Sequence, residues 1–128
     1  MVVLDSWALL AYLKDEPAAG RIESGWLESG AAISSINLGE VLYIRTRAIG
    51  EASARADVET IRRRLTSVEP EWPLVTAAAT IKANGGLSYA DAFCIATALH
   101  LEAPLWTGDP EIIDQAAEHS CEVIDLRP

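Results

Sequence analysis

Short apolar runs alternate with helical patterns along this chain, and the alternation limits the folds that it can adopt. The runs read as strands because they are short, apolar and bounded by helix-start or turn residues. They cover residues 2–4, 31–34, 104–106 and 123–124, with a weaker extended segment at 68–72. Strands that alternate with helices are typical of a parallel sheet covered on both faces through right-handed crossovers. We therefore expect an α/β fold with three layers, α/β/α, around a central parallel sheet.

The segments between the strands have helical periodicity and recognisable ends. Predicted helices cover residues 7–13, 17–27, 35–47, 50–65, 74–84, 88–101 and 110–119. The helices at 35–47 and 88–101 are apolar nearly all round, which predicts that both are largely buried. A length of 128 residues fits one domain, so residues 1–128 are expected to form a single folding unit.

The composition favours a folded cytoplasmic protein. Half of the residues are hydrophobic and 23% are charged, which is enough to bury a core. No apolar run reaches the roughly 18 residues of a membrane span, and the N-terminus lacks the basic start of a signal peptide. Cys94 and Cys121 have no close His or Cys neighbours, so both are interpreted as structural, outside any disulfide framework or zinc site.

The net charge of −9 argues against non-specific affinity for nucleic acid, which needs a positive field. A nucleic-acid substrate is still compatible with it, because several arginines are clumped and leave room for a local basic face. Arg45 and Arg47 end one predicted helix, and Arg62 to Arg64 lie in the next one.

Four acidic residues lie where an apolar run meets a helix start or inside an apolar helix, namely Asp5, Glu40, Asp91 and Asp109. Asp5 and Asp109 follow predicted strands, at the carboxyl edge where open α/β sheets bind ligands. Helices run antiparallel to the strands that they connect, so Glu40 and Asp91, in the first or second helical turn, return to that edge. The topology therefore predicts one cluster of four carboxylates.

Each acid also has a structural explanation. Asp5 and Asp109 are well placed to cap the helices that follow them, the latter just before a proline. Asp91 stands three residues after Ser88 and can complete a capping box. Glu40 has apolar neighbours on its helix face rather than a solvated one, so a carboxylate there needs a cation, either an arginine or a metal.

The four acids together favour a metal site, because separate structural roles would leave clustered carboxylates to repel one another. Ligands that are all oxygen select hard cations, so Mg²⁺ or Mn²⁺ is expected. Ser6, Asn37 and Thr107 each lie within three residues of an acid and can support the site by hydrogen bonding. Turn formation and capping are the structural alternatives for these three. The chain has no glycine-rich phosphate loop, Gly-x-Ser-x-Gly elbow or His–Cys cluster.

The segments VVLDSWALLAYL, SINLGEVLYI, LSYADAFCIATAL and PLWTGDPEI, in this order and spacing, resemble the acidic motifs of the PIN-domain nucleases. The Asp-Ser start followed by a helix, and the small size, are most similar to the VapC ribonuclease toxins of prokaryotic toxin–antitoxin pairs. Ile112, where an aromatic residue is common, and Trp106 before the threonine are mild departures that leave the acids untouched.

The resemblance implies a PIN fold in which Asp5, Glu40, Asp91 and Asp109 hold Mg²⁺ for the cleavage of RNA phosphodiester bonds. Asp5 and Asp91 are the safest metal ligands by this comparison. The Thr107-Gly108-Asp109 stretch matches the family's Thr-x-Asp pattern, which implies a supporting role for Thr107.

The resemblance also implies partners. The protein would form a homodimer, and a cognate antitoxin would cover the acidic site and hold the protein inactive. Tyr12, Trp26 and Tyr43 are candidates for an apolar interface, with core packing as the commoner fate for such residues. Arg45 or Arg47 is a candidate contact for the RNA backbone, with solvation or a salt bridge as the alternative.

Two other functions stay open at this point. A receiver-like or phosphoryl-transfer domain also places acids at the carboxyl edge of a parallel sheet, but it predicts a lysine near the site. The two lysines, Lys14 and Lys82, do not end any predicted strand. A catalytically degenerate PIN domain would bind RNA or a protein partner without cleavage, and only an activity test separates it from a ribonuclease.

Overall fold

The computed structural model describes the whole chain, residues 1–128, around a five-stranded sheet in which every pairing is parallel. The strands are β1 (Val2–Leu4), β2 (Ala31–Ser34), β3 (Thr66–Val68), β4 (Leu105–Thr107) and β5 (Val123–Asp125). Their order is β3-β2-β1-β4-β5, with β1 in the centre. Val3 of β1 is in register with Ala32 on one side and with Leu105 on the other. The carboxyl ends of all five strands therefore lie at the same edge.

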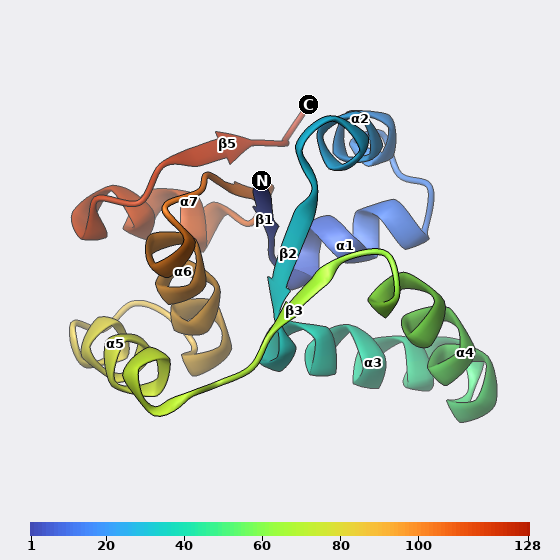
Figure 1. Ribbon diagram of the computed structural model, residues 1–128, viewed down its shortest axis with the longest axis horizontal. Coiled ribbons are helices and arrows are strands. Elements are labelled where there is room, and N and C mark those ends of the chain that lie inside the picture. Colours follow the sequence, from blue (N-terminus) through green and yellow to red (C-terminus); the bar gives the residue numbers. More distant parts are fainter.

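Seven α-helices cover the two faces of this sheet. They are α1 (Ser6–Leu13), α2 (Ala19–Ser29), α3 (Ser35–Ile49), α4 (Glu51–Arg62), α5 (Trp72–Ala83), α6 (Tyr89–Leu101) and α7 (Pro110–Ala116), and a short 3-10 helix, η1 (Ala117–His119), follows α7. In Figure 1, α1 to α4 lie on one side of the sheet and α5 to α7 lie on the other. The three-layer α/β/α fold predicted from the sequence is confirmed.

The core has two parts, one under each helical layer, because successive strand side chains point to opposite faces. In β1, Val2 and Leu4 pack with α1 to α4, whereas Val3 packs with α5 to α7. Helix α6 is buried from Ala92 to Ala98, as its apolar sequence predicts. Both cysteines are buried and unpaired. None of the helices has the length and the hydropathy that crossing a lipid bilayer requires.

The third strand lies earlier than the extended segment expected at 68–72. It spans Thr66–Val68 and pairs with β2, while Trp72 already begins α5 with Pro73 in its first turn. Proline at the start of a helix costs nothing, because the N–H that it lacks has no helical partner there. The two prolines of this segment therefore mark the loop and the helix start after the strand, and not the strand itself.

Helix α3 is less buried than its apolar sequence predicts. Its buried residues are Asn37, Leu38 and Val41, all in its first half. Tyr43 is 49% exposed and Ile44 is 37% exposed, so the second half of the helix presents apolar side chains to the surface. The pattern of a helix reports which side chains it carries, and not whether another element covers them.

Two glycines with open space around them are expected to respond in opposite ways to alanine. An added Cβ would meet nothing within 4 Å at Gly39, inside α3, or at Gly30, whose φ is +79° at the end of α2. Gly39→Ala should raise the free energy of unfolding by about 0.5–1 kcal/mol, because alanine loses less backbone entropy in a helix. Gly30→Ala should lower it by about 1–3 kcal/mol, because that backbone conformation suits only glycine. Urea unfolding measures both changes, and a destabilised Gly39→Ala variant would contradict the open environment in α3.

Candidate active site at the carboxyl edge of the sheet

The four predicted acids come from four different helix starts near the carboxyl edge of the sheet. Asp5 follows β1 and caps α1, and Asp109 follows β4 and caps α7. Asp91 lies in the first turn of α6, and Glu40 lies in the second turn of α3. Beyond the effect of burial, the charges of Asp91 and Asp109 raise the pKa of Asp5, and those of Asp109 and Glu40 raise the pKa of Asp91. The carboxylates are thus close enough to repel one another.

Asp5 is the most buried of the four, with only 2% of its surface exposed. The Ala8 amide donates to its Oδ1 at 2.8 Å, and the Thr107 hydroxyl donates to its Oδ2. Burial raises the pKa of Asp5 to about 7, the charges of Asp109 and Asp91 add to the rise, and the two hydrogen bonds oppose it. Asp5 therefore does act as a helix cap, but this role leaves the cost of its buried charge only partly compensated.

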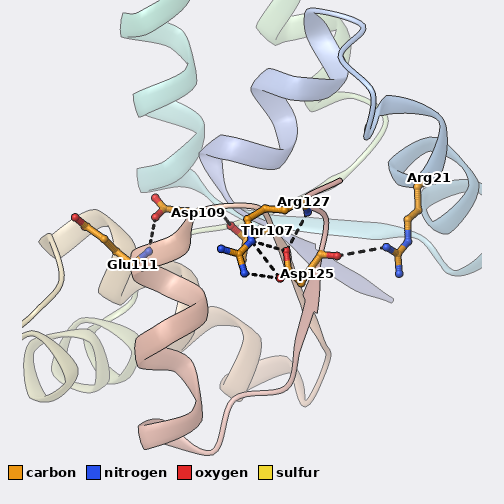
Figure 2. Close-up of polar contacts among 6 residues, drawn as sticks. All are labelled: Arg21, Thr107, Asp109, Glu111, Asp125 and Arg127. Carbon is orange, nitrogen blue, oxygen red and sulfur yellow. Dashed lines mark hydrogen bonds and ion pairs between the residues drawn. The ribbon is translucent and has the colours of Figure 1, made fainter.

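The Thr107 hydroxyl joins Asp5 to the turn that carries Asp109. Thr107 is fully buried, and its Oγ1 both donates to Asp5 and accepts a hydrogen bond from the Asp109 amide at 3.0 Å. The Asp109 carboxylate accepts a hydrogen bond from the Glu111 amide at 2.9 Å, which caps α7 (Figure 2). One hydroxyl group thus holds the ends of β1 and β4 together.

Glu40 is held by two polar side chains through the same carboxylate oxygen. Ser6 Oγ donates to Glu40 Oε1 at 2.5 Å, and Asn37 Nδ2 donates to it at 3.1 Å. Asn37 Nδ2 also donates to the Ala90 carbonyl at 2.9 Å, one residue before Asp91, and so ties α3 to the start of α6. Asn37 is 1% exposed, and its Oδ1 has no hydrogen-bond partner.

Glu40 is half-buried, which corrects the expectation that its helix face is not solvated. The reason is that Tyr43 and Ile44, which share its helix face, are themselves exposed. The salt bridge considered as a structural explanation is absent, since the ion pairs of the structure involve other carboxylates. Glu40 is therefore stabilised by neutral donors and by solvent.

Asp91 is half-buried beside the other acids. Burial raises the pKa of Asp91 to about 6; the charges of Asp109, Glu40 and Glu111 add to the rise, and a hydrogen bond with Ser88 opposes it. Ser88 Oγ accepts a hydrogen bond from the Asp91 amide at 3.1 Å and is the N-cap of α6. The first turn of this helix is therefore capped by serine.

The lysines and arginines singled out in the sequence are engaged away from the four acids. Lys14 pairs with Glu16 at 3.0 Å, and Lys82 Nζ donates to the Leu87 carbonyl at 2.7 Å, so neither is the lysine of a receiver-like site. Arg45 pairs with Asp57 of α4 at 3.3 Å. The guanidinium of Arg47 lies over the ring of Tyr43, 5.3 Å from its centroid.

Arg127, an arginine that no sequence pattern indicates, lies two residues beyond the end of β5. Asp125 is in register with Thr107, and Arg127 Nη2 binds Asp125 Oδ2 at 2.7 Å (Figure 2). The hydrogen bonds that the side chain and the amide of Arg127 donate to Asp125 lower the pKa of Asp125. Asp and Arg two residues apart are too common in sequences to have signalled this pair.

The donor set of the acidic site suits a hard cation, because its charged groups are all carboxylates. Each oxygen of Asp5 accepts a single hydrogen bond and keeps a lone pair, and both hydrogen bonds to Glu40 go to Oε1. No three or more His, Cys, Asp or Glu side chains form a ready-made cage for a metal ion. Mg²⁺ usually keeps several waters and binds one or two carboxylates. The residues therefore fit a hydrated Mg²⁺ better than a closely ligated ion.

Comparisons with known proteins agree with this fold. The chain matches the family model for the PIN domain over residues 2–119, whereas curated protein sequences give no significant match. A chain of DNA-bound VapBC from Salmonella typhimurium is similar over 98% of both chains, with a TM-score of 0.78 and 17% identity. VapBC-1 from nontypeable Haemophilus influenzae is similar over 98% of both chains, with a TM-score of 0.74 and 18% identity. VapC20 from Mycobacterium tuberculosis, a sarcin-ricin loop cleaving toxin, is similar over 89% of this chain and 94% of its own chain, with a TM-score of 0.71 and 18% identity.

Proposed function

The chain belongs to the PIN-domain family, and from this premise we propose that it is a Mg²⁺-dependent endoribonuclease that acts as the toxin of a toxin–antitoxin pair. Residues 1–128 form its single PIN-like domain in this proposal. The observation that carries it is the meeting of four carboxylates that repel one another and have no basic partner. Such a cluster is costly unless a cation compensates it during function.

In the proposed reaction, Asp5, Glu40, Asp91 and Asp109 would hold a hydrated Mg²⁺, or Mn²⁺ in its place, with one or two carboxylates bound directly and the others bound through its waters. The bound ion supplies charge neutralisation at the scissile phosphate and makes the attacking water more acidic. Asp5 contributes a carboxylate of fixed orientation, because the Ala8 amide and the Thr107 hydroxyl each hold one of its oxygens.

Three neutral side chains orient the acids in this proposal. Ser6 and Asn37 both donate to Glu40 Oε1 and leave its second oxygen for the ion. Thr107 aligns Asp5 with the backbone of Asp109. Such supporting partners commonly change metal affinity about 10–100-fold when they are removed.

The proposed partners are RNA, a cognate antitoxin and a second copy of the chain, and the proposed location is the cytoplasm. Support for an antitoxin comes from similar solved structures, which are VapBC and toxin–antitoxin complexes. The net charge of −9 suits a basic protein partner. Of the aromatic interface candidates, Trp26 is buried and packs against Tyr12 in a tilted arrangement with 5.3 Å between ring centroids, whereas Tyr43 is exposed and available to a partner.

Replacement of Asp91 by asparagine tests the activity. We expect Mg²⁺-dependent cleavage of a pool of structured RNAs by the unaltered protein, and a loss of about 100-fold or more in Asp91→Asn, since a ligand should matter at least as much as its supporting partners. Cleavage is followed by gel electrophoresis with Mg²⁺, Mn²⁺ or chelator. The matched control is Asp15→Asn, at an exposed loop position, which should keep full activity. Absence of cleavage and of metal-induced stabilisation in the unaltered protein would favour the degenerate, binding-only PIN domain.

Arg45 and Arg47 are proposed to contact the RNA backbone, and Arg47 is the better candidate because Arg45 is engaged with Asp57. Arg47→Gln should weaken RNA binding more than turnover and reduce the slope of log affinity against log salt by about 1. Filter binding at several salt concentrations measures the slope. Arg62→Gln, an exposed arginine on α4, is the control. An equal effect of both changes would indicate general electrostatics and no specific contact by Arg47.

A further inference from the structure

Trp7 lies directly against the turn that follows β4. Gly108 is buried, and a Cβ added to it would be 2.3 Å from Cζ2, 2.4 Å from Cη2 and 2.7 Å from Cε2 of the Trp7 ring. Real Cβ contacts are never this short, so any other residue here must displace either the indole or the turn. The φ of Gly108 is outside the left-handed region. Glycine is therefore required at this position by the close approach of Trp7 and not by backbone conformation.

The start of α1 contacts both Glu40 and the turn that carries Asp109. Asp5 is the N-cap of this helix, Ser6 donates to Glu40, and Trp7 packs on Gly108. The turn on which the indole packs carries the Thr107 hydroxyl and the Asp109 carboxylate on either side of Gly108. A displacement of this turn therefore changes the position of Asp109 relative to Asp5.

We propose that Trp7 is a positioning residue, whose ring holds the turn of residues 107–109 so that Asp109 faces the same ion as Asp5. The functional part of this proposal rests on the proposed metal site. The steric part stands by itself, because it depends only on the contact between the indole and Gly108. Side chains that fix a ligating group through packing act on metal affinity in the same way as hydrogen-bonding partners do.

A second glycine and tryptophan pair in the chain offers a matched control. A Cβ added to Gly25 of α2 would be 2.5 Å from Cη2 of Trp106. Gly25→Ala thus creates a clash of the same kind, but the added methyl group lies on α2 and meets the ring of Trp106, the central residue of β4. It should destabilise the fold without moving the turn that carries Asp109.

The experiment compares Gly108→Ala, Trp7→Leu, the double variant and Gly25→Ala. In Gly108→Ala we expect Mn²⁺ affinity, measured by calorimetry on folded protein, to fall about 10–100-fold. In Trp7→Leu the turn loses the ring that holds it, so the affinity should fall as well. In the double variant the added methyl group fills part of the space that the smaller leucine leaves, so the affinity should recover towards that of the unaltered protein. Gly25→Ala should lose stability in urea but keep its Mn²⁺ affinity.

A second readout is independent of the metal. The Asp109 amide donates to Thr107 Oγ1, and its hydrogen exchange reports whether the turn keeps its place. Exchange should become faster in Gly108→Ala, return towards normal in the double variant and stay slow in Gly25→Ala. Unchanged exchange together with unchanged Mn²⁺ affinity in Gly108→Ala would overturn the proposal. Lack of Mn²⁺ binding by the unaltered protein would reject the proposed function, and the exchange data would still decide whether Trp7 positions the turn.

Discussion

Asp5→Asn is expected to make the metal-free protein more stable at neutral and alkaline pH while removing its metal affinity and its RNA cleavage. The carboxylate is 2% exposed and burial raises its pKa to about 7, so its ionised form is costly in the folded protein. At 1.36 kcal/mol per pKa unit, the cost reaches at most about 4 kcal/mol, and we expect a gain of roughly 1–3 kcal/mol from the neutral amide. Asparagine can still accept from the Ala8 amide and cap α1.

The raised pKa also predicts how stability depends on pH. Between the ordinary value of 3.8 and the folded value of about 7, the folded state binds more protons at Asp5 than the unfolded state does. The stabilising contribution is therefore complete below pH 3.8 and is lost as the pH rises through about 7. Asp91, whose pKa is raised to about 6, contributes a smaller loss of stability in the same direction as the pH rises.

Urea unfolding in chelator at pH 5 to 8 measures these effects. The unaltered protein should lose stability across this range relative to Asp5→Asn, while Asp15→Asn should follow the unaltered protein. Added Mn²⁺ should act in the opposite direction, because the ion binds deprotonated carboxylates and stabilises more strongly as the pH rises. If Asp5→Asn were less stable than the unaltered protein at pH 8, Asp5 would be a structural cap whose charge is well compensated.

The fold could be predicted because its signals are local. β1 is a β-branched run that ends at a helix cap, and β4 ends in the same way before Pro110. The parallel topology then requires Asp5 and Asp109 to lie at one edge. The expected bounds of the third strand are wrong because β3 is a short edge strand with one exposed and two partly buried residues, and its pairing with β2 leaves little trace in its own sequence.

The contacts inside the site could not be predicted, because they join residues far apart in the chain. Thr107 and Asp5 are 102 residues apart, and no local pattern indicates that one donates to the other. The exposure of Glu40 depends on what covers α3, which the sequence of α3 alone does not contain. Gly108 is informative only once Trp7 is known to lie against it.

Thr107→Val is expected to weaken metal binding because it removes two hydrogen bonds, one with Asp5 and one with the Asp109 amide. Valine has nearly the shape of threonine, so the change leaves Asp5 Oδ2 without its donor and the Asp109 amide without its acceptor. Loss of the donor removes a contact that lowers the pKa of Asp5, so protons compete better with the metal. We expect the free energy of unfolding to fall by about 1–3 kcal/mol and metal affinity to fall about 10–100-fold.

Thr97→Val is the matched control for this change. Thr97 is fully buried in α6 like Thr107 in β4, but its hydroxyl donates to the Phe93 carbonyl of its own helix and to none of the acids. Calorimetric titration with Mn²⁺ should therefore give an unaltered affinity for Thr97→Val and a reduced one for Thr107→Val. Equal affinities would mean that Thr107 only closes the turn after β4, because a buried hydroxyl that orients two ligands cannot be removed without changing how tightly they hold a cation.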